Sequence, residues 1–165
     1  MTMDINVGIL TISDKGFAGE REDKSGQEIR DALRSLPGAR VGAYQVVPDE
    51  RVMIEETLRQ WADDDHLDLI LTTGGTGLSP RDVTPEATMG AIDRLVPGIA
   101  EAMREEGRKK NPRAILSRGI SGTRGQTLII NLPGSPKAVR ESLEVALPVV
   151  GHAIEILQAR PTDHS

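Results

Sequence analysis

The sequence contains no cysteine and only one phenylalanine, one tyrosine and one tryptophan among its 165 residues. The lack of cysteine excludes disulfide frameworks, thiol nucleophiles, thiolate zinc sites and iron–sulfur clusters. Phe17, Tyr44 and Trp61 are too few to build the stacking platform on which single-stranded nucleic acid is usually bound. With only three histidines, one of them His164 near the C-terminus, a His-centred triad or zinc cluster is not expected.

Charge and hydropathy narrow the class further. The formal net charge of −5 argues against general nucleic-acid binding, because neutralisation of phosphates supplies most of that affinity. No apolar run reaches membrane-spanning length and no secretory signal precedes the first strand, so a cytoplasmic protein without membrane contact is expected. The chemistry that remains uses carboxylates, hydroxyls, backbone amides, lysine and arginine.

Four short apolar runs predict buried strands, at residues 7–13, 41–48, 67–73 and 127–132. Helical periods separate them, so we expect a single three-layer α/β domain with a mostly parallel sheet flanked by helices. The domain is predicted over residues 4–158, followed by a flexible tail at 159–165. Helix starts are expected at Ser25, in a capping box with Glu28, at Thr84 and at Ser135.

Ligands of open parallel sheets bind at the carboxyl ends of the strands, so the residues that follow each predicted strand matter most. These segments are polar or rich in glycine: Ser13-Asp14, Pro48-Asp49-Glu50, Gly74–Gly77 with Arg81-Asp82 close behind, and Pro133–Lys137. Polar turn residues without any ligand are the alternative explanation for each one. Together the four segments favour a functional site.

The segment of residues 74–82, called the glycine loop below, lacks the spacing of a P-loop or of a GxGxxG dinucleotide motif. Its glycines allow a positive φ or a close approach of backbone amides to an anion. A tight turn without a ligand is the alternative.

Two basic features suggest an anionic ligand. Lys137 lies in the first turn of a predicted helix, where a cation opposes the helix dipole, so it and the helix amides are predicted to bind an anion. The segment 108–124 carries six basic residues and no acidic one, and a mobile flap there could steer a polyphosphate. The alternatives are an exposed lysine and an ordinary solvated loop.

Asp49 and Asp82 follow different strands and are the candidate catalytic carboxylates. Carboxylates beside phosphate groups suit a magnesium ion, for which Asp49 is the predicted protein ligand. One of the two could instead orient a nucleophile, as in phosphoryl transfer generally. Helix capping is the alternative role for both residues.

These motifs resemble the molybdopterin adenylyltransferase family of molybdenum-cofactor biosynthesis, and the likeness covers nearly the whole chain. The matching blocks are Thr11–Asp14, Lys24–Gly26, Val47–Glu50, Asp68–Thr88, Leu116–Arg118 and Asn131–Lys137. The resemblance implies a molybdopterin-binding fold, a cytoplasmic homotrimer, and transfer of the adenylyl group of ATP, with Mg²⁺, to the terminal phosphate of molybdopterin. Pyrophosphate is released, and a molybdenum insertase is the implied downstream partner.

Carried over to matching positions, the resemblance makes Asp49 and Asp82 the catalytic or metal-positioning carboxylates. The substrate-binding residues it implies are Ser13, Gly74, Gly75, Thr76, Ser117, Gly134, Ser135 and Lys137. Two other functions remain open at this point: a non-catalytic molybdopterin-binding or scaffolding paralogue, and a general nucleotide-binding regulator.

Overall fold

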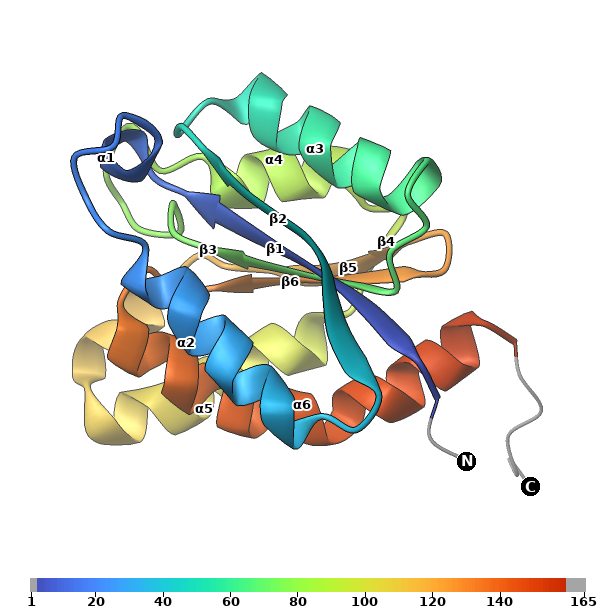
Figure 1. The fold of residues 1–165 in the computed structure, drawn as a ribbon. Coiled ribbons are helices and arrows are strands. Elements are labelled where there is room, and N and C mark those ends of the chain that lie inside the picture. Colours follow the sequence, from blue (N-terminus) through green and yellow to red (C-terminus); the bar gives the residue numbers. More distant parts are fainter. Residues whose placement is uncertain (1–2, 160–165) are drawn as a thin grey trace.

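The computed structural model describes residues 3–159, which form a six-stranded sheet between two layers of helices (Figure 1). The strands lie in the order β2-β1-β3-β6-β5-β4, and the pairs β2/β1, β1/β3 and β3/β6 are parallel. Their bounds are β1 Ile5–Ile12, β2 Ala39–Val47, β3 Leu69–Thr73, β4 Arg94–Leu95, β5 Ser121–Arg124 and β6 Thr127–Leu132. The predicted α/β class and mostly parallel sheet are confirmed.

Helices cover both faces of the sheet. Two of them, α3 (Arg51–Asp63) and α4 (Thr84–Ala91), pack on one face, and α2 (Lys24–Ala32), α5 (Pro97–Lys110) and α6 (Pro136–Leu157) pack on the other (Figure 1). The remaining short elements are α1 (Asp14–Phe17) and the 3₁₀ turns η1 (Leu33–Ser35) and η2 (Pro112–Leu116). None of the helices within residues 3–159 combines the length and apolar character needed to cross a membrane.

Successive residues of the central strands face opposite helix layers, which explains their unbroken apolar sequences. Ile9, Leu71 and Ile130 belong to the core beneath α2, α5 and α6. Leu10, Ile70 and Ile129 belong to the core beneath α3 and α4. All six side chains are fully buried, so the sheet is anchored from both sides.

Three local predictions were wrong. Strands β4 and β5 had not been expected; they extend the sheet in antiparallel fashion, and β5 occupies the end of the predicted mobile flap. Asp23, not Ser25, caps α2 through a bond from the Gly26 amide. Thr84 does not cap α4 either, because its hydroxyl donates to the carbonyl of Gly74.

Of the predicted tail, residues 160–165 lie outside the described part of the chain. Helix α6 ends at Leu157, two residues before the last described position.

Candidate active site

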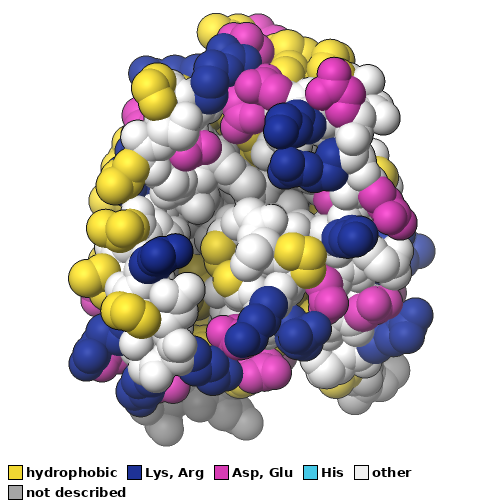
Figure 2. All heavy atoms as spheres, turned by 90° about the vertical axis from the view of Figure 1, so that its left-hand side faces the viewer, with side chains coloured by type: hydrophobic (Ala, Val, Ile, Leu, Met, Phe, Trp, Pro, Cys, Tyr) yellow, Lys and Arg dark blue, Asp and Glu magenta, His cyan; other side chains and the backbone are white. Residues whose placement is uncertain are grey.

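Two adjoining clefts open at the carboxyl edge of the parallel strands, which Figure 2 shows face-on as a hollow of mostly uncharged surface ringed by charged side chains. One cleft, of about 560 Å³, lies between the glycine loop, α5, η2 and α6; we call it the α5–α6 cleft. The other, of about 820 Å³, lies between the end of β1 and the start of α2; we call it the α2 cleft. Both are large enough for a small organic ligand.

Four residues line both clefts and form what we call the shared wall: Gly75, Asp82, Gly134 and Ser135. Of the other predicted site residues, Ser13, Asp49 and Gly74 line the α2 cleft. Thr76, Ser117 and Lys137 line the α5–α6 cleft. The structure therefore brings together all ten residues that were singled out in the sequence.

The glycine loop needs its glycines. Gly74 and Gly75 have φ values of +97° and +69°, a region that L side chains rarely adopt. A Cβ on Gly74 would lie 2.2 Å from the carbonyl oxygen of Ile12, and one on Gly75 would lie 2.2 Å from Thr84 Oγ1 and 3.2 Å from Asp49 Oδ1. The missing side chains thus allow the loop to pass against the end of β1 and close to the Asp49 carboxylate.

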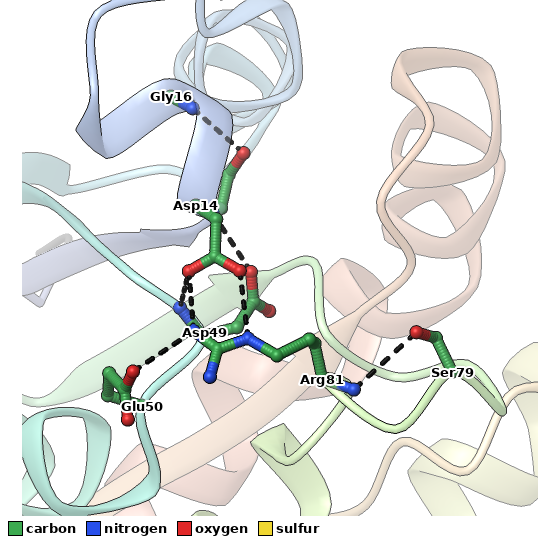
Figure 3. A network of polar contacts seen from close by, with 7 residues as sticks. Asp14, Gly16, Asp49, Glu50, Ser79 and Arg81 are labelled. Atoms are coloured by element: carbon green, nitrogen blue, oxygen red, sulfur yellow. Dashed lines mark hydrogen bonds and ion pairs between the residues drawn. The ribbon is translucent and has the colours of Figure 1, made fainter.

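Asp49 is held by a reciprocal pair of hydrogen bonds with Asp14 (Figure 3). The Asp14 amide donates to Asp49 Oδ2 and the Asp49 amide donates to Asp14 Oδ1, both at 2.9 Å. Arg81 binds the Asp14 carboxylate through Nε and Nη2, at 3.1 and 2.9 Å, and reaches Glu50 at 3.0 Å. The alternative of Asp49 as a helix cap is wrong, since Glu50 directly precedes α3 and the Asp49 side chain turns to Asp14.

Partial burial raises the pKa of Asp49 above its usual value, and the carboxylates of Asp14 and Asp82 act in the same direction. The hydrogen bond from the Asp14 amide opposes this rise. In contrast, the bond to Arg81 holds the pKa of Asp14 below its usual value. Asp14 is therefore a firmly ionised anchor, whereas Asp49 sits where additional positive charge would be favourable.

Asp82 also keeps one carboxylate oxygen available. Its Oδ2 accepts a 3.0 Å hydrogen bond from the Ser79 amide, which orients it, and α4 begins after Val83 without a side-chain cap. Within residues 3–159, neither Asp82 Oδ1 nor Asp49 Oδ1 receives a hydrogen bond. Two free carboxylate oxygens suit Mg²⁺ that takes its other ligands from phosphate and water. Among the described residues no group of three or more ligand side chains forms a self-sufficient metal site.

Four of the six basic residues of the segment 108–124 pair with acidic residues of the chain, which limits the predicted role in steering an anion to the other two. Arg108 and Lys109 pair with Glu105 and Glu106 on α5, and Arg124 pairs with Asp63. Lys110 and Arg113 line the α5–α6 cleft and are the members placed to meet a ligand.

Arg118, the sixth basic residue, fastens the glycine loop. Its guanidinium donates to the carbonyls of Gly77 at 2.9 Å and Asp82 at 2.8 Å, and pairs with Glu86 at 2.7 Å. Its amide donates to the Thr76 carbonyl at 2.8 Å. The sequence had suggested a ligand-facing cation; the structure shows a residue that bridges both ends of the loop bearing Asp82.

The serines and the lysine differ in what they offer a ligand. Ser13 Oγ accepts from the Gly16 amide and Ser135 Oγ accepts from the Ala138 amide, so both hydroxyls cap helices. Ser117 Oγ accepts a long, 3.4 Å bond from the Gly119 amide. Lys137 is exposed in the first turn of α6 and forms no ion pair with another described residue.

Asp14, Arg118, Thr84 and Ser25 were not among the predicted site residues. All four do fall in the matching blocks, and their residue type at the end of a strand or the start of a helix was the available signal. Their roles depend on contacts with distant segments.

The chain is similar in sequence and in fold to known proteins. Residues 8–152 match a family model described as "Probable molybdopterin binding domain". The chain is 42% identical over 154 residues to a molybdopterin adenylyltransferase of Helicobacter pylori, covering 93% of this chain and 88% of the relative. It is 40% identical over 151 residues to the molybdopterin adenylyltransferase of Escherichia coli K12, covering 91% and 77%. The crystal structure of the molybdopterin biosynthesis enzyme MoaB from Thermus thermophilus superposes with a TM-score of 0.89 at 58% identity, covering 95% of this chain and 98% of that one.

Proposed function

Because the chain belongs to the family of molybdopterin-binding domains, we propose that it is a nucleotidyltransferase that moves the adenylyl group of ATP to the terminal phosphate of molybdopterin. The observation that carries this proposal is the shared wall. Two clefts that meet at the Asp82 carboxylate and at the backbone of Gly75, Gly134 and Ser135 suit two substrates whose reacting phosphates must come together.

In the proposed reaction, an oxygen of the molybdopterin phosphate attacks the α-phosphorus of ATP. A phosphorus–oxygen bond forms there, while the bond from the α-phosphorus to the oxygen bridging to the β-phosphate breaks. The electron pair leaves with pyrophosphate. The attacking oxygen is already anionic, so the protein needs to align the groups and balance their charge and supplies no nucleophile.

Asp49 and Asp82 are the proposed catalytic carboxylates, and with phosphate oxygens they would hold Mg²⁺. When bound, the ion neutralises phosphate charge and fixes the orientation of the triphosphate. The raised pKa of Asp49 supports this role, because desolvation and neighbouring carboxylates favour an added cation. Asp14 and Arg81 keep the Asp49 side chain in place.

The remaining proposed contacts follow the two clefts. Gly74, Gly75, Thr76 and Ser117 contact pterin and nucleotide, and Gly134, Ser135 and Ser13 contribute nearby. Lys137, together with Lys110 and Arg113, is placed to attract the phosphates into the α5–α6 cleft.

A homotrimer, a molybdenum insertase as the acceptor of the product, and a cytoplasmic location complete the proposal. Exposed apolar side chains offer area for contacts with other chains, among them Leu78, Leu95 and Ile115. The cytoplasmic location agrees with the need for ATP.

The test is a product assay with purified protein, molybdopterin, ATP and Mg²⁺, which should release pyrophosphate and yield adenylylated molybdopterin. Asp82→Asn should abolish most of this turnover while folding stays intact. Asp93→Asn is a matched control, because Asp93 also accepts a backbone amide, that of Gly125 at 2.7 Å, but lines neither cleft. Undiminished turnover in Asp82→Asn would contradict the site assignment.

The product assay, combined with binding measurements, distinguishes the transferase from the two non-catalytic alternatives. A scaffolding paralogue would bind molybdopterin in calorimetry without consuming ATP. A nucleotide-binding regulator would bind ATP equally well with and without the pterin. Either result, together with no release of pyrophosphate in the product assay, would replace the transferase proposal.

A further inference from the structure

Three carbonyls beside the shared wall are held by hydroxyl groups from within the fold. The pairs are Thr84 Oγ1 to the Gly74 carbonyl at 2.9 Å, Thr73 Oγ1 to the Pro133 carbonyl at 2.6 Å, and Ser25 Oγ to the Gly134 carbonyl at 2.6 Å. The three donors come from α4, β3 and α2, and all are at least nine-tenths buried. Each hydroxyl therefore turns one carbonyl inward.

Because the peptide group is planar, the orientation of each held carbonyl also fixes the direction of the N–H group in the same peptide. The peptide bonds of the described residues are all trans, so the N–H of the next residue points opposite to each held carbonyl. The amides concerned are those of Gly75, Gly134 and Ser135, which all line both clefts. None of the three donates a hydrogen bond to another residue within 3–159. Gly75 is half-buried, whereas Gly134 and Ser135 are exposed at the mouth of the clefts. Three N–H groups on one wall, none of them used by another described residue, form a set of donors that suits a ligand with acceptor oxygens.

These three hydrogen bonds are needed because glycine leaves the peptides free to rotate. The peptide joining Gly74 and Gly75 lies between two residues without side chains. On the other loop, Gly134 belongs to both peptides whose carbonyls are held, Pro133–Gly134 and Gly134–Ser135. Such peptides can rotate with little steric cost, which would exchange an inward carbonyl for one that faces the clefts. A carbonyl oxygen in that position would repel a phosphate.

We propose that Thr73, Thr84 and Ser25 are positioning residues whose hydroxyls keep these carbonyls away from the clefts and so present three amides to phosphate oxygens. The inference rests on the proposed function, because it names how the same site would bind polyphosphate. Thr84 is the most informative member, since it lines neither cleft and can act only through the peptide it holds.

The fold supplies matched controls. Thr127 Oγ1 donates to the Leu67 carbonyl at 2.6 Å, and Ser121 Oγ donates to the Val96 carbonyl at 2.6 Å. Both residues are as buried as the proposed positioning residues and line neither cleft. Loss of these hydroxyls removes the same kind of bond without touching the shared wall.

The experiment compares Thr84→Val with Thr127→Val, and Ser25→Ala with Ser121→Ala, using calorimetric titration of the full chain with inorganic pyrophosphate. Thr84→Val and Ser25→Ala should raise the dissociation constant roughly tenfold, the effect of losing an amide bond to a charged group. The two controls should keep the wild-type constant. Thr84→Ser should restore binding, because serine retains the hydroxyl. Thermal melts followed by the single tryptophan, Trp61, check that each variant is folded.

Wild-type affinity in both Thr84→Val and Ser25→Ala would overturn the proposal, as would equal losses in the variants and their controls, or no pyrophosphate binding by the wild type. If Thr84→Val fails to fold, the comparison of Ser25→Ala with Ser121→Ala tests the proposal. Adenylyl transfer is measured separately. If the wild type transfers adenylyl groups but each variant binds pyrophosphate as well as its control, this inference is wrong and the proposed function stands. If Thr84→Val and Ser25→Ala selectively lose pyrophosphate binding but the wild type shows no transfer, the proposed function is wrong and this inference stands.

Discussion

Asp14 and Asp49 each accept a hydrogen bond from the other's backbone amide, at 2.9 Å in both directions. The exchange joins the end of β1 to the end of β2 and uses one oxygen of each carboxylate. It leaves Asp49 Oδ1 free beside the glycine loop, while Arg81 balances the charge of Asp14. The arrangement explains how two neighbouring carboxylates remain together at an open edge of the sheet.

Asp14→Ala should reduce adenylyl transfer through misplacement of Asp49, although Asp14 itself holds no substrate in the proposed mechanism. A displacement of about 1 Å at a reacting group can cost about 100-fold in rate, so we expect a loss between about 10-fold and 100-fold. Asp14→Asn should lose less, because the amide oxygen can still accept from the Asp49 amide. Steady-state kinetics at saturating Mg²⁺ measures both. Equal losses in the two variants would contradict a positioning role.

Arg118→Lys should impair both stability and transfer. A lysine ammonium cannot reach the Gly77 carbonyl, the Asp82 carbonyl and Glu86 at once, as the guanidinium does. We expect a loss of roughly 1–3 kcal/mol in the free energy of unfolding and a fall in kcat. Arg108→Lys is the control, because among the described residues Arg108 pairs only with Glu105, on the surface of α5. Denaturant unfolding and the transfer assay should separate the two variants.

Gly75→Ala should abolish transfer, whereas Gly125→Ala should only destabilise the protein. Both glycines have positive φ, so each alanine should cost about 1–2 kcal/mol of backbone strain. Only at Gly75 does the new Cβ also collide with Thr84 Oγ1 and crowd Asp49; at Gly125 a new Cβ would have no atom of a described residue within 4 Å apart from its chain neighbours. Activity measured at a temperature where both variants are folded tests this. Full activity in Gly75→Ala would show that the loop geometry is dispensable.

Tyr44 should ionise only at strongly alkaline pH. Partial burial and the hydrogen bond to Asp23 raise the pKa of Tyr44 from 10.0 to about 12. Because the folded-state pKa is raised, the protonated phenol contributes stability that is complete below pH 10 and is lost as the pH rises toward about 12. The chain has a single tyrosine, so ultraviolet absorbance of the phenolate reports this pKa directly. Asp23→Asn should lower it; an unchanged midpoint would mean that the Asp23 contact is not formed in solution.

Local patterns were sufficient for much of the fold. Nearly unbroken β-branched runs predicted β1, β3 and β6, because residues buried on both faces of a sheet are apolar at every position. The fourth parallel strand, β2, was also predicted as a buried strand, but it lies at the edge of the sheet and most of its residues are not buried. Glycine at positions 74 and 75 predicted a loop with positive φ, since other side chains are strained there. Helix caps were predicted less well: at Ser25 and Thr84 the hydroxyl binds a distant carbonyl in place of a local amide.

The sequence by itself therefore determined the α/β class, the parallel strands and the polar segments at their carboxyl ends, because each depends on residues close together in the chain. The tertiary structure decided which residues of those segments form hydrogen bonds with one another. Asp14 and Asp49 are 35 positions apart, and Arg118 and Gly77 are 41 apart. Such pairings depend on strand order and loop packing, which place polar groups within hydrogen-bond distance only once the sheet has formed, and no local periodicity encodes that order.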